Sequence, residues 1–181
     1  MSDDNVLSLP VGPDDHAQGP DTAPVTLLEY GDYQCSYCGE AYPVLKEVQA
    51  KMGKRLRFVF RNFPITSAHP QAFIAAEAAE AAAAQGKFWP MHDMLYEHQY
   101  DLTPESLVIY AEQLGLDMDR FVKEVNDQTH AKRIKHDFQG GVMSGVNGTP
   151  SLFINGERYD GPRDVRSLVE ALKAAGYTNG G

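Results

Sequence analysis

The chain has 181 residues and a mass of 20.0 kDa, enough for one domain or for one domain that carries an insertion. Hydrophobic residues make up 43% and charged residues 23%, and no apolar run approaches the roughly 20 residues that span a bilayer, so neither wholesale disorder nor a membrane span is expected. The net charge of −9 argues against nucleic-acid binding, because that function needs a basic face that displaces counterions from phosphate.

Only two cysteines occur, Cys35 and Cys38, and they are three positions apart. A small secreted domain held together by disulfides would carry more cysteines and would space them more widely. The pair therefore indicates chemistry rather than scaffolding.

Residues 1–24 hold four prolines and five aspartates, a composition that predicts a flexible, solvated N-terminal arm. Val6–Leu9 is the one candidate for an edge strand within it. The first residues are acidic and no apolar signal-peptide region follows, which predicts a cytoplasmic protein. A signal peptide removed before this numbering begins would make the protein periplasmic or otherwise extracytoplasmic.

A β-α-β unit is expected over residues 25–64. Val25–Tyr30 is a run of β-branched and apolar residues, as in a buried strand, and apolar residues at helical spacing then continue to Met52. Leu56–Phe63 alternates with period two and ends at a proline. Strand, helix and strand in this order predict two parallel strands.

A helical block separates this unit from the C-terminal strands. The expected helices cover residues 67–85, 87–98, 103–114, 118–125 and 127–139, and the last of them ends at Gly140-Gly141. Ser151–Ile154, an Asn155-Gly156 turn and a further strand at Arg158-Tyr159 follow, before a final amphipathic helix. The sequence thus predicts a core of residues 25–64 and 145–176, with an inserted helical lobe at 65–144.

The two cysteines lie between a predicted buried strand and the first turn of a predicted helix. Residues i and i+3 share one face of a helix, so the two thiols can close a small disulfide. Unpaired backbone N–H groups and the positive end of the helix dipole favour a thiolate at Cys35. Thiolate is the nucleophile in disulfide exchange, so Cys35 is expected to attack and Cys38 to resolve the mixed disulfide.

Two other interpretations of the pair remain open, half of a zinc site and an inert structural pair. Zinc takes four ligands, the chain has no second cysteine pair, and His92 and His98 lack the spacing of ligands on a helix. No glycine-rich phosphate loop appears either. We therefore expect no metal and no cofactor other than the redox-active Cys35–Cys38 disulfide.

The chain resembles the thioredoxin superfamily, and within it the DsbA-like oxidoreductases, over roughly residues 25–175. Three features carry the resemblance: Gly31–Cys38 directly after a hydrophobic strand, Gly148-Thr149-Pro150 before the strand Ser151–Ile154, and the order of elements. It implies an α/β thioredoxin fold with a helical insertion between an N-terminal β-α-β unit and a C-terminal β-β-α unit.

The resemblance also implies roles for single residues. Pro150 corresponds to a cis-proline next to the disulfide, and the backbone of Thr149 to a group that pairs with an extended substrate peptide. Glu29 corresponds to a buried acid under the active site, whose raised pKa suits it to shuttle the proton of Cys38. Tyr33 and Tyr37 are candidates for the substrate-binding face.

The function implied is a protein thiol–disulfide oxidoreductase that works through a mixed disulfide at Cys35. Its partners would be protein thiols and disulfides, together with a recycling system such as glutathione or thioredoxin. Strongly oxidising relatives carry Pro-His between the cysteines, whereas this chain has Ser36-Tyr37, so a less oxidising potential is expected. The alternatives are a glutathione-dependent transferase or isomerase of related fold, and a non-catalytic redox-sensing binding module.

Overall fold

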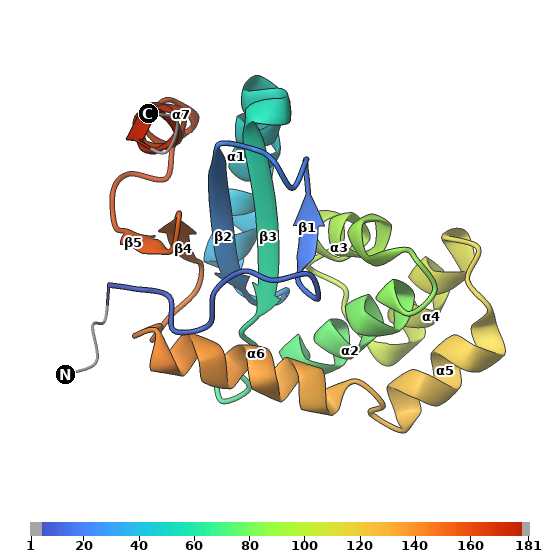
Figure 1. The fold of residues 1–181 in the computed structure, drawn as a ribbon. Coiled ribbons are helices and arrows are strands. Elements are labelled where there is room, and N and C mark those ends of the chain that lie inside the picture. The colour runs from blue at the N-terminus through green and yellow to red at the C-terminus, as the bar shows by residue number, and fades with distance from the viewer. Residues whose placement is uncertain (1–4, 179–181) are drawn as a thin grey trace.

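The computed structural model describes residues 5–178. Five strands within this range form one sheet with the order β1-β3-β2-β4-β5 (Figure 1). The strands are β1 (His16–Gln18), β2 (Val25–Gly31), β3 (Leu56–Asn62), β4 (Ser151–Ile154) and β5 (Glu157–Tyr159). The central pair, β2 and β3, is parallel, and every other neighbouring pair is antiparallel. The predicted parallel β-α-β unit is thereby confirmed.

Helices cover the sheet and form a lobe beside it. They are α1 (Ser36–Met52), α2 (Ala72–Ala83), α3 (Phe88–Glu97), α4 (Pro104–Gln113), α5 (Met118–Asn126), α6 (Ala131–Met143) and α7 (Val165–Thr178), with a 3₁₀ turn at Gly53–Arg55. Helix α1 joins β2 to β3, α2 to α6 lie between β3 and β4, and α7 follows β5. Figure 1 shows α2 to α5 gathered on one side of the sheet, with α6 running back beneath it.

The two faces of the sheet bury different clusters of apolar side chains. Leu27 of β2 packs in the larger cluster, together with residues of α1, α2, α3 and α7. Leu28 and Tyr30 pack in a second, smaller cluster on the other face. Because side chains alternate along a strand, Glu29 shares the face of Leu27 and therefore lies under α1.

The N-terminal segment packs against the sheet, so the expectation of a flexible arm is wrong for residues 5–24; residues 1–4 lie outside the described residues. Strand β1 pairs with β3 at one edge of the sheet. At the other edge the Leu7 N–H donates to the Gly156 carbonyl, and the Arg158 N–H donates to the Asn5 carbonyl. The N-terminal segment thus contacts both edges of the sheet and provides hydrogen-bond partners for backbone N–H and C=O groups of the edge strands.

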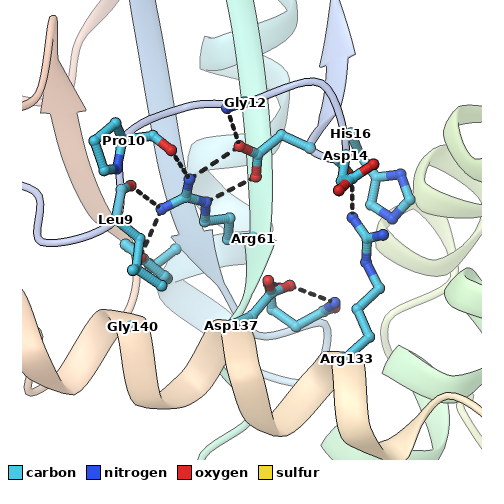
Figure 2. Close-up of polar contacts among 12 residues, drawn as sticks. Leu9, Pro10, Gly12, Asp14, His16, Arg61, Arg133, Asp137 and Gly140 are labelled. Carbon is cyan, nitrogen blue, oxygen red and sulfur yellow. Dashed lines mark hydrogen bonds and ion pairs between the residues drawn. The ribbon is translucent and has the colours of Figure 1, made fainter.

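Arg61 of β3 anchors this segment (Figure 2). Its buried guanidinium donates to both carboxylate oxygens of Asp15, at 2.8 and 2.9 Å, and to the carbonyl oxygens of Leu9 and Pro10. It also donates to the Tyr30 hydroxyl. A buried cation is costly unless it is paired and hydrogen-bonded, and the proline-rich segment supplies these partners. Composition alone could not reveal this, because the partner lies far away in the sequence.

Two predicted boundaries in the lobe are also wrong. Helix α2 begins at Ala72 rather than at Ser67, because residues 65–71 form turns. Helix α6 is shifted toward the C-terminus and continues through Gly140 and Gly141, which were expected to end it. A Cβ at Gly141 would lie 2.7 Å from the ring of Phe63, so close packing of the helix on the sheet explains the glycine there.

Other local predictions are confirmed. The Thr103 side chain caps α4 by accepting from the Ser106 N–H, and the Asp117 side chain caps α5. Asn155 and Gly156 both have positive φ, as the turn between β4 and β5 requires. Within residues 5–178, none of the helices has the length and apolar character needed to cross a membrane.

Candidate active site

Cys35 is the N-cap residue of α1, and this helix follows directly on the loop that leaves β2. Its N–H donates to the Asp32 carbonyl at 3.1 Å, which turns the chain from the strand into the helix. Cys35 is 4% exposed and Cys38, one turn later, is fully buried; both are free thiols. The predicted placement of the pair at the helix N-terminus is confirmed.

The loop before β4 lies against this turn. Strands β2 and β4 are antiparallel, with Tyr30 opposite Ser151, so the end of one strand meets the beginning of the other. The Thr149–Pro150 peptide bond is cis, and the Cys35 sulfur lies 3.5 Å from the Thr149 carbonyl oxygen. Two motifs more than 100 residues apart in sequence thus lie in contact.

The two thiols have opposite acidities. The pKa of Cys35 is lowered to about 5, chiefly because the Cys38 thiol donates to its sulfur; burial opposes this, and the backbone N–H groups of Tyr37 and Cys38 assist it. Burial raises the pKa of Cys38 well above its ordinary value, and its hydrogen bond to Cys35 raises it further. At neutral pH the site therefore holds one thiolate, on Cys35, and one thiol.

Glu29 is a buried carboxyl beneath these thiols, 1% exposed, and its Oε1 atom has no hydrogen-bond partner among the described residues. Burial raises its pKa to about 8, and the negative charge of Cys35 adds to the effect. Arg163 acts in the opposite direction and also donates to the Pro150 carbonyl at 3.4 Å. Glu29 is therefore a protonated acid near neutral pH that can release its proton slightly above it.

The two candidate tyrosines differ. Tyr37 is 60% exposed, beside Cys38. Tyr33 is only 1% exposed, and its hydroxyl bonds Nδ1 of His92 at 3.0 Å, so its predicted place on the substrate face is wrong. It packs against Phe60 and Tyr96 in the core instead. Alternation along the motif did not show which of the two tyrosines faces inward, because the chain turns between them.

Asp32 is a site residue that its local sequence did not single out. Its buried carboxylate accepts from the Gln34 N–H, from the Ile65 N–H and from Nδ1 of His69, the last at 2.7 Å. It thereby ties the loop that enters the helical lobe to the turn before Cys35. His69, in the turns before α2, is thereby held against this carboxylate. An acid three residues before the first cysteine was the available signal.

Histidines and acids do not gather into a metal site here: within residues 5–178, no group of three or more His, Cys, Asp or Glu side chains is placed to hold a metal ion. His92 lies buried among Phe60, Trp89 and Tyr96. Burial lowers its pKa to about 3, so its imidazole is neutral and serves as packing.

Comparisons with known proteins agree with this geometry. A family model described as thioredoxin matches residues 12–174. The solved structure of BdbD from Bacillus subtilis, in its oxidised form, superimposes with a TM-score of 0.86 at 22% identity, over 96% of this chain and 98% of that one. A thioredoxin-like oxidoreductase from Silicibacter pomeroyi gives a TM-score of 0.80 at 26% identity, over 91% and 93% of the two chains. The thioredoxin-like fold with a helical insertion is thereby confirmed.

Curated relatives are considerably longer than this chain. A protein named Na(+)/H(+) antiporter NhaA 1, from Salinispora arenicola, is 48% identical over 170 residues, which cover 93% of this chain and 26% of that protein. The chain thus spans about a quarter of the length of that relative.

Proposed function

The chain belongs to the thioredoxin family, and we propose that it is a thiol–disulfide oxidoreductase that exchanges disulfides with protein substrates. The observation that carries the proposal is the acidity difference in one turn of helix, where Cys35 has a pKa of about 5 beside the buried Cys38 thiol. The proposal concerns the segment that this chain contains; the antiporter name belongs to relatives about four times as long.

Exchange begins at Cys35. Its thiolate attacks one sulfur of a substrate disulfide, the substrate S–S bond breaks, and the other substrate sulfur leaves as a thiolate. Cys38 then loses its proton and attacks the Cys35 sulfur of the mixed disulfide, and the second substrate sulfur leaves. The substrate has gained two electrons, and Cys35 and Cys38 are joined as a disulfide. The same steps in reverse oxidise a dithiol substrate.

We assign Glu29 as the group that accepts the proton of Cys38. Cys38 must be deprotonated before it can attack, although burial favours its neutral form. Glu29 lies on the sheet face beneath the pair and has a pKa of about 8 while Cys35 is charged. Once the Cys35 sulfur is part of the mixed disulfide, its negative charge no longer raises this pKa, so more of the Glu29 carboxyl is ionised and able to accept the Cys38 proton. Its Oε1 atom has no hydrogen-bond partner among residues 5–178, so it can take up or release a proton without breaking a hydrogen bond.

Substrate peptides are proposed to bind along the loop before β4. The Thr149 backbone lies beside the Cys35 sulfur, where it can pair with an extended peptide next to the cysteine being attacked. Tyr37 lies in the same helical turn as Cys35 and has an exposed ring, which can pack against the side chains of that peptide.

The direction of exchange is proposed to follow the surrounding redox poise. Ser36-Tyr37 supplies no positive charge to the Cys35 thiolate, which supports a potential less oxidising than that of relatives with Pro-His. In the cytoplasm, which we propose as its location, glutathione or the thioredoxin system would keep the pair reduced and the protein would act as a reductant. In an extracytoplasmic compartment the same pair would be recycled by an oxidant.

The buried position of Cys38 separates this proposal from its rivals. A glutathione-dependent transferase works through one nucleophile and needs no second thiol, whereas here Cys38 is the largest cause of the low pKa of Cys35. A redox-sensing binding module would show little turnover and a large change in partner affinity upon reduction. Measuring turnover and affinity on the same preparation distinguishes these outcomes.

The test is the reduction of insulin by dithiothreitol in the presence of catalytic amounts of the protein. The wild-type protein is expected to accelerate the reaction, and Cys35→Ala to reduce the rate to that without protein. Circular dichroism shows whether the variant is folded. If folded Cys35→Ala accelerates insulin reduction as the wild type does, the proposal is wrong.

A further inference from the structure

A glutamine of the helical lobe reaches the backbone of the catalytic turn. Gln99 follows α3, and its side-chain amide nitrogen Nε2 donates to the Tyr33 carbonyl at 2.9 Å and to the Cys35 carbonyl at 2.6 Å. An amide NH₂ group has two hydrogens, so each carbonyl can receive one. Only the nitrogen end of the amide can serve both acceptors, because an oxygen in that position would face two other oxygens.

The first turn of α1 is shaped to admit this side chain. A Cβ at Gly39 would lie 2.1 Å from Oε1 of Gln99 and 2.8 Å from its Cδ, so no larger residue fits there without displacing the glutamine. The Gly39 N–H in turn donates to the Cys35 carbonyl at 3.0 Å, which is the same oxygen that Gln99 binds. The glycine after Cys38 and the glutamine thus form one contact.

Fixing the Cys35 carbonyl fixes more than one atom. The carbonyl and the next N–H belong to one rigid peptide plane, so holding the oxygen holds the rotation that leads from Cys35 into α1. The backbone N–H groups of Tyr37 and Cys38, which stabilise the thiolate, follow immediately. They reach the sulfur only while this first turn keeps its orientation, since hydrogen bonds weaken steeply away from linear geometry.

We propose that Gln99 is a positioning residue for the Cys35 nucleophile: it ties the helical lobe to the Tyr33 and Cys35 carbonyls and so holds the turn that presents the thiolate. The inference rests on the proposed thiol–disulfide exchange and adds a residue that does not touch the reacting sulfur. The helical lobe would then contribute to catalysis, because Gln99 supplies its hydrogen bonds to the Tyr33 and Cys35 carbonyls.

The test is the substitution Gln99→Met, which keeps the length of the side chain and removes both donors. The matched control is Gln85→Met, in the same lobe, where the glutamine also bonds backbone groups, the N–H and carbonyl of Asp117. The Cys35 titration is followed by thiolate absorbance, and the reaction with an aromatic disulfide gives the rate. We expect Gln99→Met to move the titration midpoint up by about one pH unit, a tenfold change in the ionisation constant, and Gln85→Met to leave it unchanged.

Two results would overturn the inference: a Gln99→Met protein that titrates like the wild type, or a Gln85→Met protein that shifts as far as Gln99→Met. If Gln99→Met does not fold, Gln99→Leu replaces it, since its side chain cannot donate and adds no charge near the thiolate; the same shift is expected and its absence contradicts the inference. Failure of the proposed function is seen separately, as a wild-type protein with no insulin-reducing activity.

Discussion

Cys35 owes its acidity to neighbours a few ångströms away rather than to a charged partner. No cationic side chain is among the main causes of its lowered pKa; the first is the thiol of Cys38. The helix N-terminus contributes through two backbone N–H groups, as expected for a thiolate at this position. Cys38 thus has two roles: its thiol stabilises the Cys35 thiolate, and it later attacks the Cys35 sulfur of the mixed disulfide.

This dependence predicts different outcomes for two substitutions of Cys38. Cys38→Ala removes the donor, so the Cys35 pKa should rise from about 5 by about one unit or more. Cys38→Ser keeps a hydroxyl donor in the same place and should retain most of the acidity. The measurement is the pH dependence of Cys35 alkylation. Equal midpoints in the two variants would show that the Cys38 thiol is not the cause.

Glu29 predicts a pH dependence of stability. Its pKa in the folded protein is about 8, above the value in an unfolded chain, so the native state holds a proton that the unfolded state has lost. The contribution of Glu29 to the free energy of unfolding is therefore complete below its pKa in the unfolded chain. It is lost as the pH rises through its pKa in the folded protein.

The prediction is tested in a Cys35→Ser/Cys38→Ser background, which removes the titrating thiols. Burial, the main cause of the raised Glu29 pKa, remains in this background, although the Cys35 charge does not. Between about pH 5 and about pH 8 that protein should lose roughly 2–3 kcal/mol more than the same protein carrying Glu29→Gln, by urea unfolding. The comparison cancels other groups that titrate in this range, such as Glu77. Identical pH dependence with and without Glu29 would contradict the assigned pKa.

How well single residues could be predicted depended on whether their neighbours are close in sequence. Cys35 and Cys38 follow from a strand, a turn and a helix in order, whereas Glu29 was implied by the family resemblance; the structure places all three where they were expected. Tyr33 was misplaced because its partner His92 lies 59 positions away. Gln99 was missed because nothing in its local sequence distinguishes a glutamine that binds two distant carbonyls from one that is solvated.

At the scale of elements, α6 shows why a glycine pair need not end a helix. Gly140 and Gly141 lie within α6 at the point where it meets the sheet. Helix propensity alone favours a break there. The close approach to Phe63 and to Leu9 overrides it, because a helix with side chains at these positions would be held away from the sheet. Tertiary packing of this kind is not visible in a local pattern.

Two glycine-to-alanine substitutions separate these effects. Gly141→Ala should destabilise the protein by about 1–3 kcal/mol, since its Cβ would lie 2.7 Å from the Phe63 ring and overpack the interface. Gly176→Ala, in α7, meets no atom nearer than 3.8 Å and should stabilise by up to about 1 kcal/mol through helix propensity. Thermal unfolding measures both. A stabilising Gly141→Ala would show that the glycine is not required by packing.

At the scale of the whole molecule, the N-terminal segment closes both edges of the sheet. It pairs with β3 at one edge, contacts β5 at the other, and is held between them by Arg61. Its proline-rich composition predicted flexibility, because composition counts apolar surface and not the hydrogen bonds that a distant arginine provides. The order of strands and the inserted lobe were predictable, whereas this long-range closure was not.

Asp15→Asn tests the closure. Burial opposes ionisation of Asp15, but the hydrogen bonds from Arg61 hold its pKa below the ordinary value, so it is charged at neutral pH. Removing the charge leaves the buried guanidinium without a counterion and should cost about 3 kcal/mol. Hydrogen exchange at β1 should accelerate with it. Asp14→Asn is the matched control, because only the backbone carbonyl of Asp14 bonds Arg133. Equal effects of the two substitutions would contradict the assigned role.

The central claim is that Cys35 attacks and Cys38 resolves, and trapping the intermediate tests it most directly. Cys38→Ala should accumulate a mixed disulfide with a disulfide-containing protein substrate, and peptide mass spectrometry should find the substrate joined to Cys35. Cys35→Ala should trap far less, because the remaining Cys38 is fully buried and its pKa is raised. A Cys38→Ala protein that is folded and forms no mixed disulfide, or a Cys35→Ala protein that forms as much, would contradict the account.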